Sequence, residues 1–116
     1  MNPTLMTLLE IQDLRSKLRE LEQTPDMEVE EFHIDPGAAR EHLATKVEEL
    51  EQGLPDAIRR RYRQVASNRQ RVVVPVINGV CYGCFVSIAA ATAGDQDPNT
   101  ELRSCETCGR FLYILN

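Results

Sequence analysis

The chain has 116 residues, of which 42% are hydrophobic and 27% are charged, and its net charge at neutral pH is −5. This length fits one compact domain or two very small ones, and the ordinary composition excludes collagen-like and membrane-spanning proteins. No run approaches the roughly 18 apolar residues of a membrane helix, and the start Met1-Asn2-Pro3-Thr4 lacks the basic and apolar segments of a secretory signal. We therefore expect a cytoplasmic protein without a membrane partner, in which the thiols stay reduced.

The first 66 residues carry helical patterns. Asn2 before Pro3 predicts a capped helix start, and the helix is expected to run over residues 3–23 and to end at Thr24-Pro25. Apolar residues at spacings of three and four support it: Leu8, Ile11, Leu14, Leu18 and Leu21. A second helix is expected from Asp35-Pro36-Gly37 to about Gly53, and a short third helix over residues 55–66.

The apolar stripes of the two long helices have similar lengths, which favours a coiled-coil-like antiparallel α-helical hairpin. A homodimer formed through residues 8–21 would bury the same stripe and stays open as an alternative. The tip of the hairpin, residues 24–34, combines acidic and apolar side chains. We interpret five of these residues as a partner-binding tip, with a mobile polar loop as the simpler alternative: Asp26, Glu28, Glu30, Glu31 and Phe32.

The last third of the chain is β-rich and holds all four cysteines. Residues 71–77, 85–88 and 111–115 are predicted strands, and Pro75 is expected to restrict the first of them to a sheet edge or a bulge. The predicted fold is therefore a small α+β protein. A helical hairpin with a short third helix (residues 1–66) is followed by a short-stranded β module (residues 67–116), for which the spacing of its cysteines predicts a zinc ribbon.

Cys81-Tyr82-Gly83-Cys84 and Cys105-Glu106-Thr107-Cys108 have the spacing of a four-thiolate zinc site. Two residues between the cysteines allow one tight turn to direct both sulfurs at the same metal. Gly83 and Gly109 are expected where these turns need backbone conformations that side chains disfavour. A redox motif would need a βαβ unit, disulfides an oxidising compartment and catalytic zinc an open ligand position. We therefore predict a structural Zn²⁺.

Residues 74–84 and 105–113 resemble the bacterial C4-type zinc ribbon family, in which an N-terminal coiled-coil hairpin precedes a zinc ribbon. The resemblance is specific over residues 55–116 and includes the opening Leu-Leu-Glu-Ile-Gln-Asp-Leu of residues 8–14. It implies a link to transcription through an alternative sigma factor, and a link to RNA binding. The arm is shorter here than is usual in the family, and Phe85 stands where the family more often places His.

Charge is unevenly distributed: residues 1–58 carry 14 acidic and 5 basic side chains, whereas residues 59–80 carry six arginines and no acid. This block could neutralise phosphates of RNA or DNA, with Tyr62 available for stacking, or it could be a solvated helix face. The arginines concerned are Arg59, Arg60, Arg61, Arg63, Arg69 and Arg71.

No nucleophile with a base and an orienting group is present in the sequence pattern, and no glycine-rich phosphate loop, so we do not expect an enzyme. The expected function is that of a zinc-ribbon adaptor or regulator associated with transcription or nucleic acid. Its acidic helical arm would contact a protein partner such as RNA polymerase or a sigma factor. The alternative is a pure protein–protein interaction module, homodimeric or not, that has no contact with nucleic acid.

Overall fold

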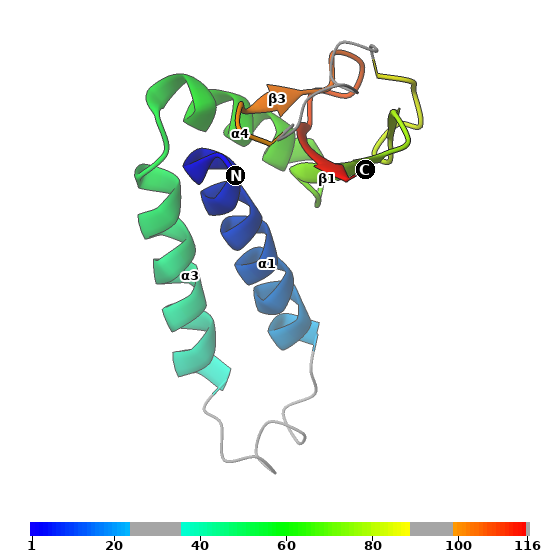
Figure 1. Cartoon of the computed structure of the whole chain (residues 1–116). Coiled ribbons are helices and arrows are strands. Elements are labelled where there is room, and N and C mark those ends of the chain that lie inside the picture. The colour runs from blue at the N-terminus through cyan, green and yellow to red at the C-terminus, as the bar shows by residue number, and fades with distance from the viewer. Residues whose placement is uncertain (24–35, 89–98, 116) are drawn as a thin grey trace.

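The computed structural model describes residues 1–23, 36–88 and 99–115, which form a small α+β fold. The predicted α+β class is confirmed. Three helices precede a four-stranded sheet (Figure 1): α1 (Pro3–Gln23), α3 (Pro36–Gln52), α4 (Asp56–Asn68), β1 (Val73–Ile77), β2 (Val80–Cys81), β3 (Arg103–Ser104) and β4 (Phe111–Leu115). None of the helices in the described ranges is long and apolar enough to cross a membrane.

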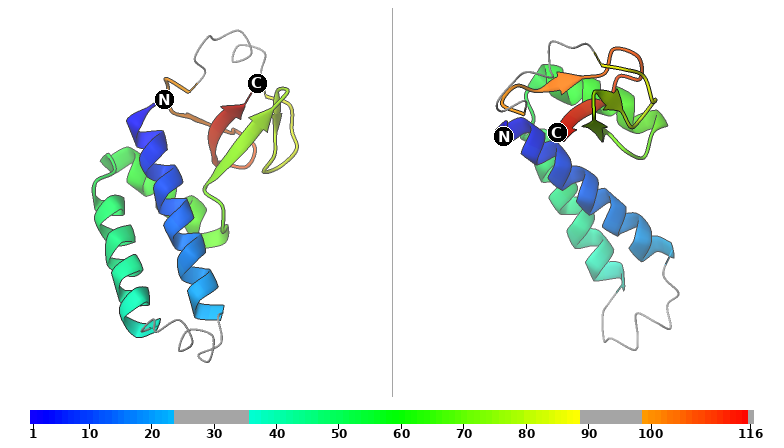
Figure 2. Two further views of the ribbon diagram at one scale, coloured as in Figure 1. Left: turned by 60° about the horizontal axis from the view of Figure 1, so that its bottom comes forward. Right: turned by 45° about the vertical axis from the view of Figure 1, so that its right-hand side comes forward.

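The two long helices lie side by side, and the sheet sits at the end of the pair where α1 begins (Figures 1 and 2). The start of α1 is fixed by the predicted cap. The side-chain oxygen of Asn2 accepts the backbone N–H groups of Thr4 at 2.8 Å and of Leu5 at 3.2 Å. The backbone N–H of Asn2 also donates to the carbonyl of Asn99 at 2.7 Å, so the helix start is tied to the segment that leads into β3.

The sheet has the strand order β2-β1-β4-β3, with β1 and β4 parallel and both outer pairs antiparallel. The expectation that Pro75 lies at an edge or a bulge is wrong, because β1 is an inner strand. Its pairing with β2 covers only Val76 and Ile77, so Pro75 lies beyond that ladder and needs no N–H there. The carbonyl of Pro75 accepts the N–H of Tyr82 at 3.0 Å.

The predicted strand over residues 85–88 is reduced to a single bridge between Val80 and Ser87. The physical reason is local, since Phe85 has φ +61° and therefore leaves extended geometry at the first residue of the predicted strand. Between β1 and β2, Asn78 and Gly79 both have positive φ, as a tight Asn-Gly hairpin turn requires.

Side chains alternate between the two faces of the central strand pair, so the sheet separates two apolar clusters. Val73 and Phe111, which are register partners, face a cluster that also contains Leu5, Leu8 and Ile11 of α1. Val47, Leu54, Tyr62, Val65 and Val72 complete the buried residues of this cluster. The opposite face carries the second cluster, whose buried residues are Val74, Val76, Cys81, Cys105, Leu112 and Ile114.

One further contact holds α1 against β1. The side-chain oxygen of Gln12 accepts the backbone N–H groups of Val72 at 2.7 Å and of Val73 at 2.8 Å. These two donors precede the ladder of β1 or begin it, and the glutamine supplies the acceptor that they would otherwise lack. A helix near the amino terminus and the first strand are thereby fixed to each other across about sixty residues of chain.

Candidate metal centre

The four cysteines lie on two tight turns at one end of the sheet. Cys81, the last residue of β2, and Cys84 lie in the first turn, residues 81–85, which we call the first knuckle. Cys105 and Cys108 lie in the second turn, residues 105–109, between β3 and β4, which we call the second knuckle. Both turns close with the same bond. The N–H of Phe85 donates to the carbonyl of Cys81 at 2.6 Å, and the N–H of Gly109 donates to that of Cys105 at 2.8 Å.

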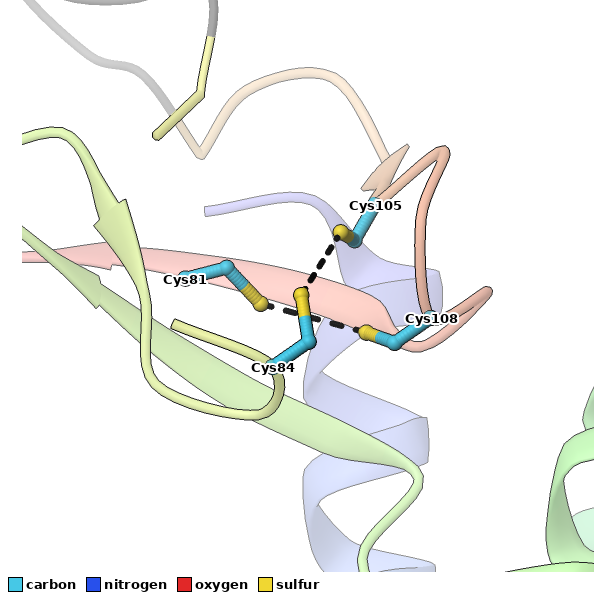
Figure 3. A group of neighbouring side chains, drawn as sticks. All are labelled: Cys81, Cys84, Cys105 and Cys108. Atoms are coloured by element: carbon cyan, nitrogen blue, oxygen red, sulfur yellow. Dashed lines mark hydrogen bonds between the residues drawn. The ribbon is translucent and has the colours of Figure 1, made fainter. Parts of the chain in front are cut away.

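The two knuckles direct all four sulfurs into one small volume (Figure 3). The Sγ atoms of Cys81 and Cys108 are 3.9 Å apart, those of Cys84 and Cys105 are 3.6 Å apart, and all four lie within 4.8 Å of one another. A tetrahedron with metal–sulfur bonds of about 2.3 Å has sulfur–sulfur edges of about 3.8 Å. The sulfur positions therefore fit a four-coordinate metal ion, and the cysteine cluster is a metal-binding site in its geometry.

The cysteine cluster is largely shielded from solvent. Cys81 and Cys105 are 0% and 1% exposed and belong to the second apolar cluster, while Cys84 and Cys108 are half-buried and pack against it. The group contains no histidine and no carboxylate. Four sulfur donors complete a tetrahedral coordination shell, so no coordination position remains open for a water or a substrate.

The thiols differ in their acidity. Burial, together with hydrogen bonds to the neighbouring thiols, raises the pKa of Cys84 to about 12, although a backbone hydrogen bond from Val86 lowers it in part. Burial also raises the pKa of Cys105, but hydrogen bonds from the backbone of Cys108 and Thr107 outweigh it and lower the pKa to about 7. Cys105 is thus more readily ionised than Cys84, and a bound cation would supply the charge that stabilises the Cys84 thiolate.

The two glycines of the knuckles are needed for different structural reasons. Gly109 has φ +77°, as expected for the residue that closes its knuckle. The same expectation is wrong for Gly83, whose φ is not positive; the equivalent left-handed residue of the first knuckle is Phe85. Gly83 instead leaves room for a close approach, because a Cβ there would collide with the side chains of Arg110 and Val74.

The predicted arginine block is divided among different surroundings. The guanidinium of Arg59 donates to the carbonyls of Glu51 at 3.2 Å, Gln52 at 2.7 Å and Leu54 at 2.9 Å, and thus satisfies the carboxyl end of α3. The Nε of Arg61 donates to the carbonyl of Gly109 at 3.4 Å. Arg59 is half-buried and has a role inside the fold, whereas Arg61 is exposed and makes this contact at the surface.

The other four arginines of the block are exposed. Arg60 and Arg63 lie on α4, whereas Arg69 and Arg71 follow it and line a recess together with Arg110. Arg110 was missed by the sequence analysis. Forty residues separate it from Arg69, and only its place two residues after Cys108 could have suggested that a knuckle positions it.

The suggestion that Tyr62 stacks on a nucleic-acid base is wrong, because its side chain is 1% exposed. The guanidinium carbon of Arg15 lies 5.9 Å from the centroid of its ring. Burial, followed by a hydrogen bond with Glu51, raises the pKa of Tyr62 to about 12. The predicted tip residues lie outside the described residues: Asp26, Glu28, Glu30, Glu31 and Phe32.

Comparisons with known proteins give one informative similarity. No protein-family model matches the chain, and no curated protein matches it. The solved structure of CT398 from Chlamydia trachomatis is similar, with a TM-score of 0.54 and 26% sequence identity. The similarity covers 69% of this chain and 34% of CT398, so the chain spans about a third of the length of that protein.

Proposed function

We propose that the chain is a non-enzymatic zinc-ribbon adaptor or regulator, associated with transcription or nucleic acid, in which a helical arm contacts a protein partner. The observation that carries this proposal is the group of four cysteine sulfurs within 4.8 Å of one another. Soft thiolate donors in a tetrahedral arrangement are typical of zinc or of iron–sulfur sites, and a closed four-cysteine shell is typical of structural zinc. In this proposal Cys81, Cys84, Cys105 and Cys108 hold the ion, which fastens the two knuckles to each other.

The arm of the proposed adaptor is an antiparallel hairpin made by α1 and α3. Its support is the side-by-side placement of these helices beyond the sheet, together with the acidic character of the chain up to residue 58. Assignment to the C4-type zinc ribbon family belongs to the same proposal, and the spacing of the four cysteines supports it. An acidic arm of this kind fits a basic surface on a partner such as RNA polymerase or a sigma factor.

A second candidate function is a protein–protein interaction module, in the cytoplasm, that has no contact with nucleic acid. The distribution of the arginines favours it. The half-buried Arg59 donates to three backbone carbonyls of the fold, so one of the six arginines is not available to a phosphate backbone. Salt-dependent gel shifts with RNA and DNA distinguish the two candidates, because contact with phosphates makes affinity fall steeply with salt.

The partner is tested by affinity purification of the tagged full chain from the cell in which it is native. The co-purified proteins are analysed for RNA polymerase, sigma factors and ribosomal subunits. The Glu30→Ala plus Glu31→Ala variant is purified in parallel for comparison. Enrichment of polymerase or a sigma factor that the variant loses is the expected result. Equal recovery by both proteins would remove the tip from the mechanism, and recovery of none of these partners would contradict the transcription role. Light scattering of the purified chain tests the homodimer.

A further inference from the structure

A basic recess lies where the carboxyl end of α4, strand β1 and the first knuckle meet. Its volume is about 370 Å³, and the side chains that give it its character are Arg69, Arg71, Tyr82 and Arg110, which we call the arginine recess. No carboxylate in the described part of the chain forms an ion pair with any of these three arginines. Three arginines thus line one recess that is open to solvent, and guanidinium groups pair well with carboxylate and phosphate groups.

The side chain of Arg110 lies against the first knuckle. Its side chain packs over Gly83 so closely that a Cβ at that residue would collide with it. The Nε atom of Arg110 is buried and has no hydrogen-bond partner among the described residues. An anionic ligand in the recess would place hydrogen-bond acceptors beside this guanidinium group.

Exposed apolar side chains of the first knuckle, and of Val86 directly after it, lie next to the recess. Phe85 is 72% exposed, Tyr82 is 47% exposed and Val86 is 40% exposed; we call these three residues the aromatic patch. The ring centroids of Tyr82 and Phe85 lie 5.7 Å apart. Because Tyr82 belongs to both the patch and the recess, the apolar and basic surfaces are continuous.

The backbone at Phe85 indicates that its ring serves something other than the fold. Phe85 has φ +61°, a conformation that is costly for a bulky residue and that glycine adopts freely. The second knuckle has Gly109 at the equivalent position, with φ +77° and the same closing hydrogen bond. The Phe85 side chain belongs to neither apolar cluster that the described residues form. A strained residue that contributes no core packing is typical of a functional surface.

We propose that the arginine recess and the aromatic patch together bind an acidic segment of a protein partner. Carboxylates of that segment pair with Arg69, Arg71 and Arg110, and an apolar side chain next to them packs on Phe85 and Tyr82. The inference rests on the proposed adaptor function and gives it a second contact surface, distinct from the helical arm. The site depends on the first knuckle, so it forms only in the metal-loaded protein.

The chemistry of this surface favours a protein over a polynucleotide. Arginine, tyrosine and phenylalanine are enriched in protein interfaces whereas lysine is depleted, and residues 67–116 contain no lysine. A polynucleotide needs a continuous basic path, and the nearby Arg61 donates instead to the carbonyl of Gly109. Val86 adds an aliphatic surface, which suits an apolar side chain better than it suits a base.

The test is an NMR titration of the isotope-labelled, metal-loaded full chain with defined probes. The first probe is a short peptide rich in glutamate with one central phenylalanine; the second replaces each glutamate by glutamine. Oligouridine and oligothymidine of similar length are the third and fourth. We expect the acidic peptide to shift the amides of Tyr82, Gly83, Phe85 and Arg110, and the glutamine peptide to bind at least about tenfold more weakly.

Paired variants with equal change of charge locate the site. Arg69→Gln plus Arg71→Gln should weaken the acidic peptide about tenfold or more, whereas Arg60→Gln plus Arg63→Gln on α4 should change its affinity by less than about twofold. Phe85→Gly should weaken binding about fivefold while the protein keeps its metal. Metal content and the dispersion of the amide spectrum confirm that each variant is folded.

Three results would overturn the proposal. The first is the absence of peptide-induced shifts at these amides at millimolar concentration, and the second is equal weakening by the two double variants. The third is tighter binding of oligouridine or oligothymidine than of the peptide at the same residues, which would make the surface a nucleic-acid site. If the docking surface fails while the chain still binds zinc and enriches its partner through the arm, the proposed function stands without it.

Discussion

Phe85 occupies the left-handed region of the backbone at φ +61°, where an L-residue costs about 1–2 kcal/mol relative to its usual conformations. The cost is retained because the bond from the Phe85 N–H to the Cys81 carbonyl closes the first knuckle and orients Cys84. At Gly109 the same geometry carries no such strain, since glycine has no Cβ. The two halves of the cysteine cluster therefore differ in stability at a single backbone position.

The strain at Phe85 predicts an unusual order of stabilities. The Phe85→Gly variant should be about 1 kcal/mol more stable than Phe85→Ala, which keeps the Cβ and the strained conformation. The corresponding difference in Tm is about 3–6 °C for the metal-loaded proteins. Thermal unfolding followed by circular dichroism measures it, and Gly109→Ala, the opposite change at the equivalent position, should lower Tm. A Phe85→Ala protein as stable as Phe85→Gly would contradict the strain.

At this scale the sequence determines the cysteine cluster well, because the ligand spacing reflects one local turn and needs no knowledge of the rest of the chain. It does not determine which residue of each knuckle takes positive φ. The preference of glycine for positive φ predicted Gly83 for this conformation. In the structure Phe85 adopts it instead, against that preference. The close approach of Arg110 to Gly83 is a tertiary contact and has no local signal in the sequence.

The elements are held together by a few polar contacts at their ends. Arg59 of α4 donates to three carbonyls at and just beyond the carboxyl end of α3, and Gln12 of α1 accepts two N–H groups at the start of β1. Buried or half-buried backbone groups at these junctions lack partners within their own elements. The angle between elements is thus set by side chains that neither propensity nor apolar periodicity identifies.

Removal of the Gln12 amide tests this kind of contact. Gln12→Ala leaves the N–H groups of Val72 and Val73 without their acceptor, so we expect a loss of about 1–3 kcal/mol in the free energy of unfolding. Gln64→Ala on the exposed face of α4 is the matched control and should stay within about 0.5 kcal/mol of the parent. Urea unfolding of the metal-loaded proteins gives both values. Equal stabilities for the two variants would show that this junction is held by apolar packing alone.

The local patterns predicted the helices reliably and the place of β1 in the sheet wrongly. The expected helix over residues 3–23 coincides with α1, and the cap at Asn2 is confirmed. Pro75 led to the wrong expectation that its strand lies at a sheet edge or carries a bulge. The missing N–H of a proline matters only where a neighbouring strand needs a donor. Since β2 pairs with β1 over only Val76 and Ile77, no donor is needed at Pro75 on that side. Short strands carry too few residues for sequence to specify which strands become neighbours.

At the scale of the whole molecule, two apolar clusters share the sheet between them. The first joins the helices to the sheet through Val72, Val73 and Phe111, and the second packs against the cysteines. The sequence indicated leucine stripes and a metal site as separate sources of stability. The common cluster could not be read from local patterns, since it brings Leu8 and Phe111 together from opposite ends of the chain.

This arrangement predicts that the metal stabilises more than the knuckles. A structural zinc site supplies on the order of 10–16 kcal/mol of folding free energy. Chelation under reducing conditions should therefore abolish the dispersed amide signals of β1 and β4. It should also lower the thermal midpoint of the helical circular dichroism, because α1 loses its contact with the sheet. Added zinc should restore both signals. An apo protein that keeps its full sheet by NMR would contradict a structural role.

The central claim is that four thiolates hold one zinc ion at the end of the sheet. X-ray absorption at the zinc edge of the purified full chain, with metal analysis of the same sample, tests it most directly. The account predicts one zinc per chain with four sulfur neighbours at about 2.3 Å. A shell that mixes sulfur with nitrogen or oxygen, or a chain purified with another metal in stoichiometric amount, would contradict it.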